Sequence, residues 1–453
     1  MIAGIDIGTS SVKVILVDSK LNTVKITRAA YKEISPSGWF QAIRDALMEF
    51  DAHKISAVGL SSQVGTYIIN EKDVITWKDP YGKDELTALK SEISSKEFLK
   101  EISMPHPDII SYPLPRLKYI ITHFENVRSV CQVKDYIIKK LTGSLYTDKY
   151  SQRGIANLST GEYSERLLSH IGASEGLLPP IMDPFCKAGC ITKEAADFTG
   201  LLSGTPVYTG CNDFFSALLG MGIKDNDLFD ITGTSEHVGV LTDKMDLDTK
   251  MVCGPYFKKN AYYGVTASSG VSLNYAGNFY NIDDINKPCY KSNTPIFLPY
   301  LNGERAPIFD PDARGVFFGV NSGTTQKDLA YAIAEGISFS VYHIFKKLDT
   351  DNISRIVVSG GSSRKILLNQ IKANLFGKPV VTLKEKEASA LGAAIIASCG
   401  EGILKSPDEA LSYIDINNTF IPQKSDILIQ RFEIYKELYP ALKDQFTKYG
   451  RLL

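Results

Sequence analysis

An acidic side chain stands inside an apolar strand near the N-terminus, directly before a turn of small polar residues. In AGIDIGTSSVKVILVD (3–18), Asp6 precedes a Gly-Thr-Ser turn with Thr9 and Ser10. Such a turn offers backbone N–H groups and hydroxyls with little bulk, which suits phosphate. An acid at its base suits Mg²⁺, which offsets phosphate charge. We therefore expect Asp6 on the metal side and Thr9 and Ser10 on phosphate, with Lys13 of the second strand as a charge partner.

The same pattern returns about half the chain later. FDITGTSEHVGVLTD (229–243) again sets an aspartate, Asp230, in an apolar strand before a Gly-Thr-Ser turn. A single hairpin of this kind is more often a solvated turn. Two copies, each opening a long α/β segment, favour a duplicated domain whose hairpins bind polyphosphate. We expect the two domains at residues 1–224 and 225–453.

A strand that ends in paired glycines suggests a third element of a nucleotide site. SRIVVSGG (354–361) runs into Gly360 and Gly361 before a helix, so that a ligand can approach the backbone closely. This arrangement suits the nucleoside end of ATP. Paired glycines also occur in many strand-to-helix turns that bind nothing.

The stretch VYTGCNDFFSALLGMG (207–222) supplies an acid for proton transfer. A predicted strand ends in Gly210, and Asp213 follows at the start of a helical segment. A hydroxyl that attacks a phosphate benefits from a carboxylate that accepts its proton. A helix N-cap is the alternative role for an aspartate at this position.

The elements that must position these residues alternate between strands and helices, which predicts an α/β fold with mixed sheets. We expect strands at 2–7, 12–18 and 55–60, and helices at 38–54, 387–400 and 426–449.

The composition excludes several classes of partner. The net charge of −1 gives no sign of nucleic-acid binding, and no apolar run reaches the roughly 18 residues of a membrane span. The seven cysteines have no zinc-site spacing, so reduced thiols in the cytoplasm are the simplest interpretation.

The segment PYLNGERAPIFDPDARGVFFGVNSGTTQKDLAYAIAEGISFSV (299–341) resembles the signature of the FGGY carbohydrate kinases, within the actin-like ATPase superfamily. KDYIIKKLTGSLYTDKYSQ (134–152) is similar to a stretch midway through the first domain of that family. The resemblance covers nearly the whole chain. It implies two actin-like (ribonuclease H-like) α/β domains, with mixed sheets flanked by helices and a cleft between them. It also implies a sugar site on the first domain and an ATP site on the second. Most residues of 299–341 are expected to shape the loops around the nucleotide.

The resemblance assigns roles to individual residues. It places the catalytic base in a G-x-x-D-x-x-x-A stretch, which here selects Asp213. It implies nucleotide contacts at Thr234, Gly270, Asn274 and Gly361. The polar face of a helix is the alternative interpretation of Asn274.

Three residues of the first half match family positions near the sugar: Gln63, Trp77 and Asp79. Asp79 would accept hydrogen bonds from substrate hydroxyls, and Trp77 would stack on a sugar face. The alternative for Asp79 is an ordinary acid in a turn, and the alternative for Trp77 is an aromatic residue of the core.

The substrate segment SSQVGTY (61–67) departs from the family pattern. Members that act on xylulose usually carry Gln-Met-His here, and members that act on glycerol carry Gln-Arg-Glu, whereas this chain has Val64 and Gly65. Phe214 also follows Asp213 where relatives often have Asn or Gln. A pocket less polar than that of the best-known members is expected.

Together these features predict an ATP- and Mg²⁺-dependent kinase that phosphorylates a hydroxyl of a ketose such as xylulose. Gluconate or another polyol or sugar acid is the alternative substrate. A non-catalytic actin-like ATP-binding switch is the alternative function. We expect a cytoplasmic protein, with a homodimer as one possible assembly.

Overall fold

The structure is a computed structural model, which describes residues 1–105, 109–244, 251–285, 287–288, 294–348 and 352–452. The chain divides into two compact units. The first consists of Met1–Gly222, Gly254–Lys258 and Glu387–Ile414, and the second of Ile223–Cys253, Lys259–Lys386 and Asp415–Leu453. The first break thus falls two residues before the expected boundary at 224/225. Residues 254–258 and 387–414, which we expected in the second domain, pack in the first unit.

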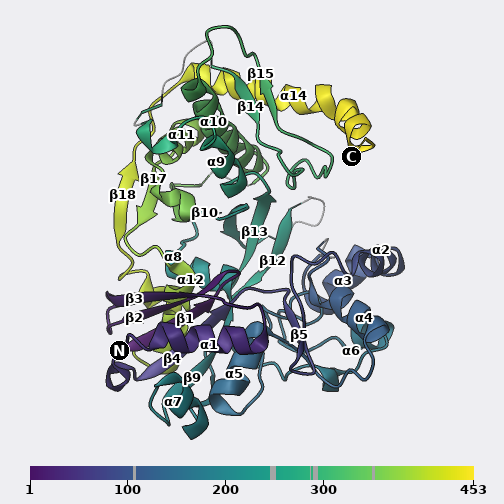
Figure 1. Cartoon of the computed structure of the whole chain (residues 1–453), viewed down its shortest axis with the longest axis vertical. Coiled ribbons are helices and arrows are strands. Elements are labelled where there is room, and N and C mark those ends of the chain that lie inside the picture. Colours follow the sequence, from purple (N-terminus) through teal and green to yellow (C-terminus); the bar gives the residue numbers. More distant parts are fainter. Residues whose placement is uncertain (106–108, 245–250, 286, 289–293, 349–351, 453) are drawn as a thin grey trace. The chain divides into compact units, whose positions relative to one another are not determined.

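A six-stranded mixed sheet forms the centre of the first unit, in the order β3-β2-β1-β4-β9-β8 (Figure 1). Its strands are β1 (Ile2–Ile7), β2 (Ser11–Val17), β3 (Thr23–Ala30), β4 (Ala57–Ser62), β8 (Lys187–Cys190) and β9 (Pro206–Asn212). β1 and β2 form an antiparallel hairpin, whereas β4 runs parallel to β1 and β9 parallel to β4. β1 and β4 are buried along their whole length, which is typical of parallel strands covered on both faces.

One face of this sheet packs against α1 (Pro36–Leu47) and α5 (Val133–Thr142), and α7 (Lys193–Thr199) contacts these two helices. α1 follows Ser35, whose hydroxyl oxygen accepts a backbone N–H and caps the helix. The prediction that this helix runs to residue 54 was wrong. It ends at Leu47 with Met48 as its C-cap, and Asp51 accepts the His53 N–H to begin a separate turn, η1 (Ala52–Lys54).

The other face packs against α12 (Ala388–Gly400), which also contacts α8 (Asp213–Met221). A Cβ atom on Gly4 of β1 would lie 2.0 Å from the carbonyl oxygen of Ala390, and one on Gly59 of β4 would lie 1.9 Å from that of Ala393. Gly392 lets α12 approach the backbone of α8 in the same way. These glycines bring the backbones into direct contact, and this contact holds α12 in the first unit.

The first unit also contains a small antiparallel sheet in the order β6-β5-β7 and several peripheral helices. These elements are β5 (Tyr67–Ile69), β6 (Asp73–Ile75), β7 (Val130–Gln132), α2 (Lys83–Glu92), α3 (Ser95–Ile102), α4 (Pro113–His123), α6 (Glu165–His170), η2 (Glu175–Leu177) and α13 (Pro407–Ala410).

A seven-stranded sheet forms the centre of the second unit, in the order β12-β13-β11-β10-β16-β17-β18. Its strands are β10 (Asp227–Thr232), β11 (Glu236–Thr242), β12 (Val252–Tyr256), β13 (Lys259–Thr266), β16 (Arg355–Gly360), β17 (Val380–Leu383) and β18 (Ile416–Phe420). From β13 to β18, the order and relative directions of the strands repeat those from β3 to β8 in the first sheet. The β10–β11 hairpin therefore occupies the position of the β1–β2 hairpin, in agreement with the repeat in the sequence.

Helices α10 (Gln326–Phe345), α11 (Ile366–Phe376) and α14 (Asp426–Gly450) contribute to the hydrophobic core of the second unit. The Arg431 guanidinium of α14 makes a buried ion pair with Glu335 of α10 and donates a hydrogen bond to the carbonyl oxygen of Thr294. The elements outside the sheet are α9 (Gly270–Ala276), η3 (Ile282–Asp284), β14 (Ile296–Leu298), β15 (Val316–Phe318), α10 (Gln326–Phe345), η4 (Gly361–Arg364), α11 (Ile366–Phe376) and α14 (Asp426–Gly450).

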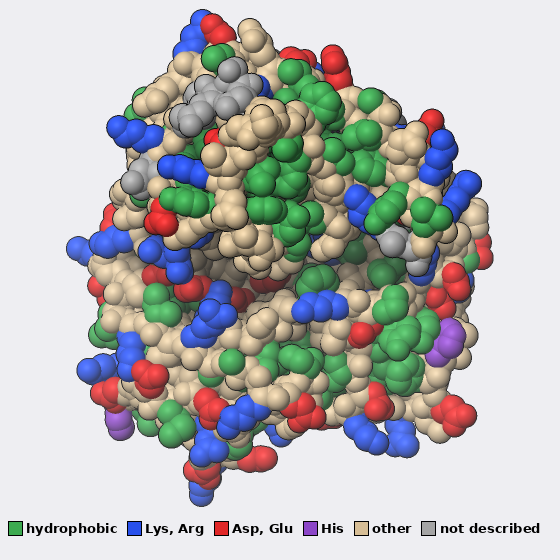
Figure 2. Space-filling model, turned by 45° about the horizontal axis from the view of Figure 1, so that its top comes forward, with side chains coloured by type: hydrophobic (Ala, Val, Ile, Leu, Met, Phe, Trp, Pro, Cys, Tyr) green, Lys and Arg blue, Asp and Glu red, His purple; other side chains and the backbone are tan. Residues whose placement is uncertain are grey.

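The charged side chains are mixed on the surface. Figure 2 shows basic and acidic side chains interspersed over the viewed face, consistent with the net charge of −1. In the part of the chain that the structure describes, no helix combines the length and the apolar character that a membrane crossing requires.

We predict that Gly59→Ala destabilises the first unit. The new methyl group would collide with the backbone of α12, and overpacking of this kind costs about 1–3 kcal/mol. Urea unfolding followed by circular dichroism measures the change. Gly176→Ala is the matched control, because a methyl group there would come no closer than 3.8 Å to its nearest neighbour, a serine hydroxyl oxygen. Equal stability of the two variants would contradict the proposed packing constraint.

Candidate active site

The turn between β1 and β2 is closed by short hydrogen bonds. The Gly8 N–H donates to the carbonyl oxygen of Ser11 at 3.1 Å, and the Tyr31 hydroxyl donates to the carbonyl oxygen of Gly8 at 2.8 Å. Thr9 is partly buried and Ser10 is exposed. The structure therefore presents both predicted phosphate contacts on a fixed turn, and their role in binding stays a prediction.

Asp6 lies at the base of this turn and is only 5% exposed. Its carboxylate accepts a hydrogen bond from the Ser61 hydroxyl at 3.1 Å. The pKa of Asp6 is raised to about 7, mainly by burial and also by the charges of Asp213 and Glu387, whereas Lys13 and Ser61 oppose the shift. The ionised form of Asp6 is thus disfavoured in the folded protein, and a nearby cation would stabilise it.

Lys13, beside the turn, has an acidic partner. Its ammonium group makes a 2.6 Å ion pair with Glu387, the residue that precedes α12. Sequence reasoning missed Glu387, because nothing in the local pattern brings residue 387 to β2. Lys13 is therefore placed as expected, but part of its charge is already balanced.

Asp213 is the first residue of α8 and is partly buried. The helix cap is supplied by its neighbour Asn212, whose side chain accepts the Phe215 N–H at 3.0 Å. The alternative interpretation of Asp213 as an N-cap is therefore wrong. Burial raises the pKa of Asp213 to about 6, although the Phe214 N–H and the Arg153 charge oppose the shift. A carboxylate with this pKa is suited to accept a proton near neutral pH.

The carboxylates around Asp6 fit a magnesium ion that is shared with phosphate. Asp213 and Glu387 act electrostatically on Asp6, so a divalent cation would relieve their repulsion. Among the described residues, no group of three or more His, Cys, Asp or Glu side chains encloses a metal site. Mg²⁺ usually needs only one or two carboxylates, because waters and substrate phosphates complete its coordination.

The predicted substrate segment 61–67 lies beside the same hairpin. The Gln63 N–H donates to the carbonyl oxygen of Ile7 at 3.0 Å, and Gln63 is 5% exposed. Its side-chain oxygen is buried and accepts no hydrogen bond from the described residues. A buried acceptor normally has a partner, and a substrate hydroxyl as that partner stays a prediction.

The missing side chain at Gly65 has a structural explanation. Gly65 has φ +79°, and a Cβ atom there would lie 2.8 Å from the Cβ of Ser111. The segment around Ser111 thus fills the space that a larger residue at position 65 would occupy. The Gly65 N–H donates to the Gln132 side chain at 3.0 Å, which fixes the loop.

Trp77 and Asp79 lie on one short loop that a buried arginine holds. The Arg116 guanidinium donates to the carbonyl oxygens of Thr76 and Asp79. One carboxylate oxygen of Asp79 accepts from the Thr76 N–H and hydroxyl at 2.7 and 2.8 Å, so this oxygen stabilises the turn. Trp77 is partly exposed rather than buried, which argues against a core role. Contact of either side chain with sugar stays a prediction.

The second unit brings three of the predicted nucleotide positions together. The Gly270 N–H donates to the carbonyl oxygen of Gly233 at 3.0 Å, and a Cβ atom on Gly270 would lie 3.3 Å from the Cα of Thr234. In the neighbouring strand, a Cβ atom on Gly360 would lie 1.9 Å from the carbonyl oxygen of Thr232. These glycines therefore pack the surrounding loops onto the β10–β11 turn.

The remaining two predicted nucleotide residues are more open. A Cβ atom on Gly361 would meet no described residue within 4 Å, so this position leaves room for a ligand. Asn274 is exposed on α9, and the structure gives its side chain no feature that separates a nucleotide contact from the polar helix face.

The aspartate of the second hairpin belongs to a buried charge cluster that the sequence did not reveal. The Lys372 ammonium of α11 lies 2.6 Å from Asp230 and also contacts Glu236. Burial and the charge of Glu236 raise the pKa of Asp230 well above its ordinary value, against the effect of Lys372. Burial alone would raise the pKa of Glu236, but Lys372 lowers it.

Glu304, in the segment that resembles the family signature, organises the loop before α9. It accepts hydrogen bonds from the Ala267 N–H at 2.7 Å and from the hydroxyls of Thr266 and Ser340 at 2.9 and 3.1 Å. The Ser268 hydroxyl also donates to it. This residue therefore shapes a loop that leads to Gly270, as we expected for most of the segment.

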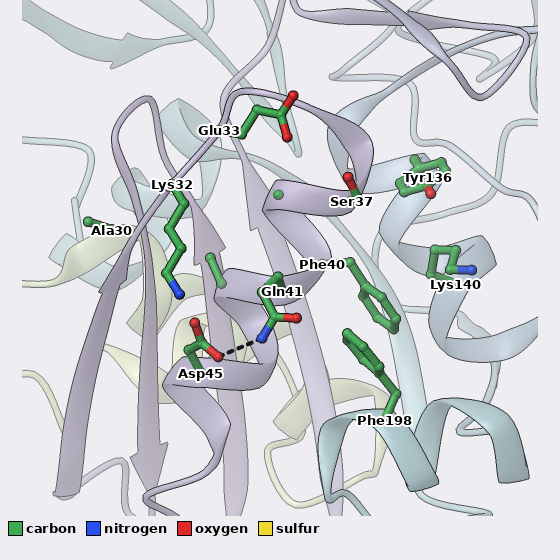
Figure 3. A pocket seen from close by; sticks show the side chains of 12 residues that line it. Ala30, Lys32, Glu33, Ser37, Phe40, Gln41, Asp45, Tyr136, Lys140 and Phe198 are labelled. Carbon is green, nitrogen blue, oxygen red and sulfur yellow. Dashed lines mark hydrogen bonds between the residues drawn. The ribbon is translucent and has the colours of Figure 1, made fainter.

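A separate open cavity of about 460 Å³ lies beside α1 in the first unit (Figure 3). Phe40 and Phe198 stack at its wall with ring centroids 4.6 Å apart, and Gln41 donates to Asp45 at 2.7 Å. None of the predicted site residues lines this cavity.

Comparison with known proteins gives the same family for both parts of the chain. Residues 1–220 match the N-terminal domain of the FGGY family of carbohydrate kinases, and residues 229–400 match the C-terminal domain of that family. A xylulose kinase of Staphylococcus xylosus is 27% identical, over 97% of this chain and 99% of its own. A gluconokinase of Bacillus licheniformis is 24% identical, over 98% of this chain and 96% of its own.

Solved structures agree with the fold. The xylulose kinase of Lactobacillus acidophilus has a TM-score of 0.87 and 25% identity, over 99% of both chains. The gluconate kinase of the same organism has a TM-score of 0.86 and 26% identity, also over 99% of both chains.

We predict that Asp6→Asn stabilises the protein, and that the gain grows as the pH rises from about 4 to about 7. The folded Asp6 carboxyl keeps its proton up to about pH 7, whereas the unfolded carboxyl loses it near 3.8. Over this range the folded state binds more protons, so wild-type stability falls with increasing pH. An amide at this position removes that loss.

Urea unfolding of Asp6→Asn and wild type at pH 4.5 and 7.5 measures this difference. The exposed Asp73→Asn controls for removal of a carboxylate. A stability difference that is the same at both pH values would contradict the prediction.

We predict that Lys372→Met destabilises the second unit by about 3–5 kcal/mol, because it leaves two buried acids without their cation. Lys365→Met is the matched control on the same segment, since its 2.7 Å pair with Asp283 is partly exposed and should contribute at most about 1 kcal/mol. Chemical unfolding of both variants provides the measurement. Similar losses in the two would show that the buried cluster does not stabilise the hairpin.

Proposed function

The chain belongs to the FGGY family of carbohydrate kinases, and from this premise we propose that it transfers the γ-phosphoryl group of ATP to a hydroxyl of an open-chain sugar or sugar acid. The observation that carries the proposal is the state of Asp213. This carboxylate begins α8 without capping it, and its pKa is raised to about 6 beside a second buried acid, Asp6. Such a group is suited to act as a base.

In the proposed reaction, the substrate hydroxyl oxygen attacks the γ-phosphorus and loses its proton to the Asp213 carboxylate. A bond forms between this oxygen and phosphorus. The bond from the γ-phosphorus to the bridging oxygen breaks, and its electron pair leaves with ADP. Asp213 later returns the proton to solvent.

The two units contribute different residues. On the first, Thr9 and Ser10 are proposed to bind phosphate, Gln63 to accept a substrate hydroxyl, and Asp6 to hold Mg²⁺ through its waters. Bound Mg²⁺ would offset the charge of the transferring phosphate. On the second, the nucleotide is proposed to contact a group of residues around the β10–β11 turn: Thr234, Gly270, Asn274, Gly360 and Gly361.

Two substrate classes follow from the names of the relatives, because xylulose is a ketose and gluconate is an aldonic acid. Gly65, packed against Ser111, carries neither the His nor the Glu that marks the xylulose- and glycerol-specific patterns. A coupled assay of ADP release over ketoses, aldonic acids, alditols and glycerol tests the class. The cytoplasmic location and the homodimer remain predictions.

We predict that Asp213→Asn lowers kcat by about 10²- to 10⁴-fold, because the amide cannot accept the proton. In wild type, kcat/KM should fall below about pH 6, where Asp213 becomes protonated. Asp426→Asn is the matched control, since Asp426 is likewise the first residue of a helix with a polar cap. Unchanged turnover of Asp213→Asn would exclude Asp213 as the base. Absence of turnover by wild type with every compound would favour a non-catalytic ATP-binding switch.

A further inference from the structure

A cation that neither the repeat nor the family signature indicated lies near the proposed base. Arg153 is partly buried, and its charge acts on the Asp213 carboxyl. Its guanidinium carbon lies 5.6 Å from the ring centroid of Phe215, two residues after Asp213 on α8. The side chain therefore reaches the beginning of α8.

Aromatic rings and a tight turn fix the position of this guanidinium. The ring of Tyr112 lies 5.0 Å from the guanidinium carbon. Asp148 accepts the N–H groups of Tyr150 and Ser151 at 2.9 and 3.0 Å, which holds the turn just before Arg153. A cation between aromatic faces is oriented as well as stabilised.

The same turn is connected to the substrate segment. The Gln132 side chain accepts the Gly65 N–H at 3.0 Å and donates to the carbonyl oxygen of Ser151 at 2.6 Å. Ser111, which fills the space beside Gly65, directly precedes Tyr112. Arg153 is thus linked to the Gly65 loop on one side and to α8 on the other, all within the first unit.

The position of the Arg153 guanidinium is relevant to whether the substrate is neutral or negatively charged. A neutral ketose offers a guanidinium only hydroxyl and carbonyl oxygens. A carboxylate matches the planar fork of an arginine and adds a charge-assisted hydrogen bond. The Gly65 position itself provides no side chain for this purpose, so a neighbouring segment would have to supply one.

We propose that Arg153 binds the carboxylate of an open-chain sugar acid, so that this kinase acts on an aldonic acid in preference to a neutral ketose. The inference rests on the proposed kinase function and names its substrate class. The buried Gln63 side-chain oxygen would accept a hydroxyl of the same substrate. Arg153 is then a specificity-determining residue, distinct from the base.

The test measures steady-state kinetics with two size-matched sets of compounds. The first set is xylonate, xylulose and xylitol, and the second is gluconate and glucitol. Wild type should favour the acid of each set. Arg153→Gln should lower kcat/KM for the acids by about 30- to 100-fold, mainly through KM, and change the neutral compounds only a few-fold. Arg153→Lys should retain part of the preference. Arg44→Gln is the matched control, because Arg44 also packs on an aromatic ring, Phe198, at 5.3 Å.

A uniform fall in kcat for acids and neutral compounds in Arg153→Gln would overturn the inference, because it would place Arg153 on the phosphoryl group or on the base. A wild-type preference for the ketose would also overturn it. A shift of the acid limb of the pH profile to higher pH, equal for all substrates and with the preference for the acids unchanged, would also overturn it, because Arg153 would then act only through its charge on Asp213. If Arg153→Gln melts well below wild type, Arg153→Lys decides the same comparison.

Calorimetry separates this inference from the proposed function. If wild type turns over no compound, the kinase proposal fails, but binding of xylonate and gluconate is still measured without ATP. Binding to wild type that is lost in Arg153→Gln and kept in Arg44→Gln supports the carboxylate site. Equal binding of acid and neutral compounds, or no binding of the acids, overturns it.

Discussion

Direct backbone contact between α12 and the central sheet is the constraint on which the first unit depends. Gly4 and Gly59 let the helix lie against β1 and β4, and Gly392 lets it lie against α8. This packing places Glu387 beside Lys13, and the Ser389 hydroxyl 3.2 Å from the carbonyl oxygen of Asp213. The hairpin and the proposed base are therefore positioned by one helix that is remote from both in sequence.

The aspartates of the two hairpins occupy the same backbone position but have different charged neighbours. Asp6 is buried with other carboxylates acting on it and with Lys13 opposing them, and its pKa is raised to about 7. Asp230 occupies the equivalent strand position but is neutralised by a buried lysine. The two hairpins thus share their strand pairing, while their aspartates have different charged neighbours.

Local pattern in the sequence was enough to predict what depends on local geometry. The hairpins follow from an apolar strand, a Gly-Thr-Ser turn and a second strand, and the start of α8 from the change at Asp213. It was not enough for contacts across long separations, such as Lys372 with Asp230, 142 residues apart, or Arg153 beside α8. The role of Gly65 was also hidden, because the segment that fills its space lies elsewhere in the chain.

The return of residues 387–414 to the first unit has a consequence for protein synthesis. Chains emerge from the ribosome N-terminus first, and domains generally fold as they appear. Here the face of β1 and β4 that carries Gly4 and Gly59 lacks its contact with α12 until that helix has been made. A fragment that ends near residue 222 would expose this face, even though it contains every strand of the first sheet. The strands of the first sheet therefore come from one continuous stretch of chain, but that stretch lacks the helix that completes the packing of the unit.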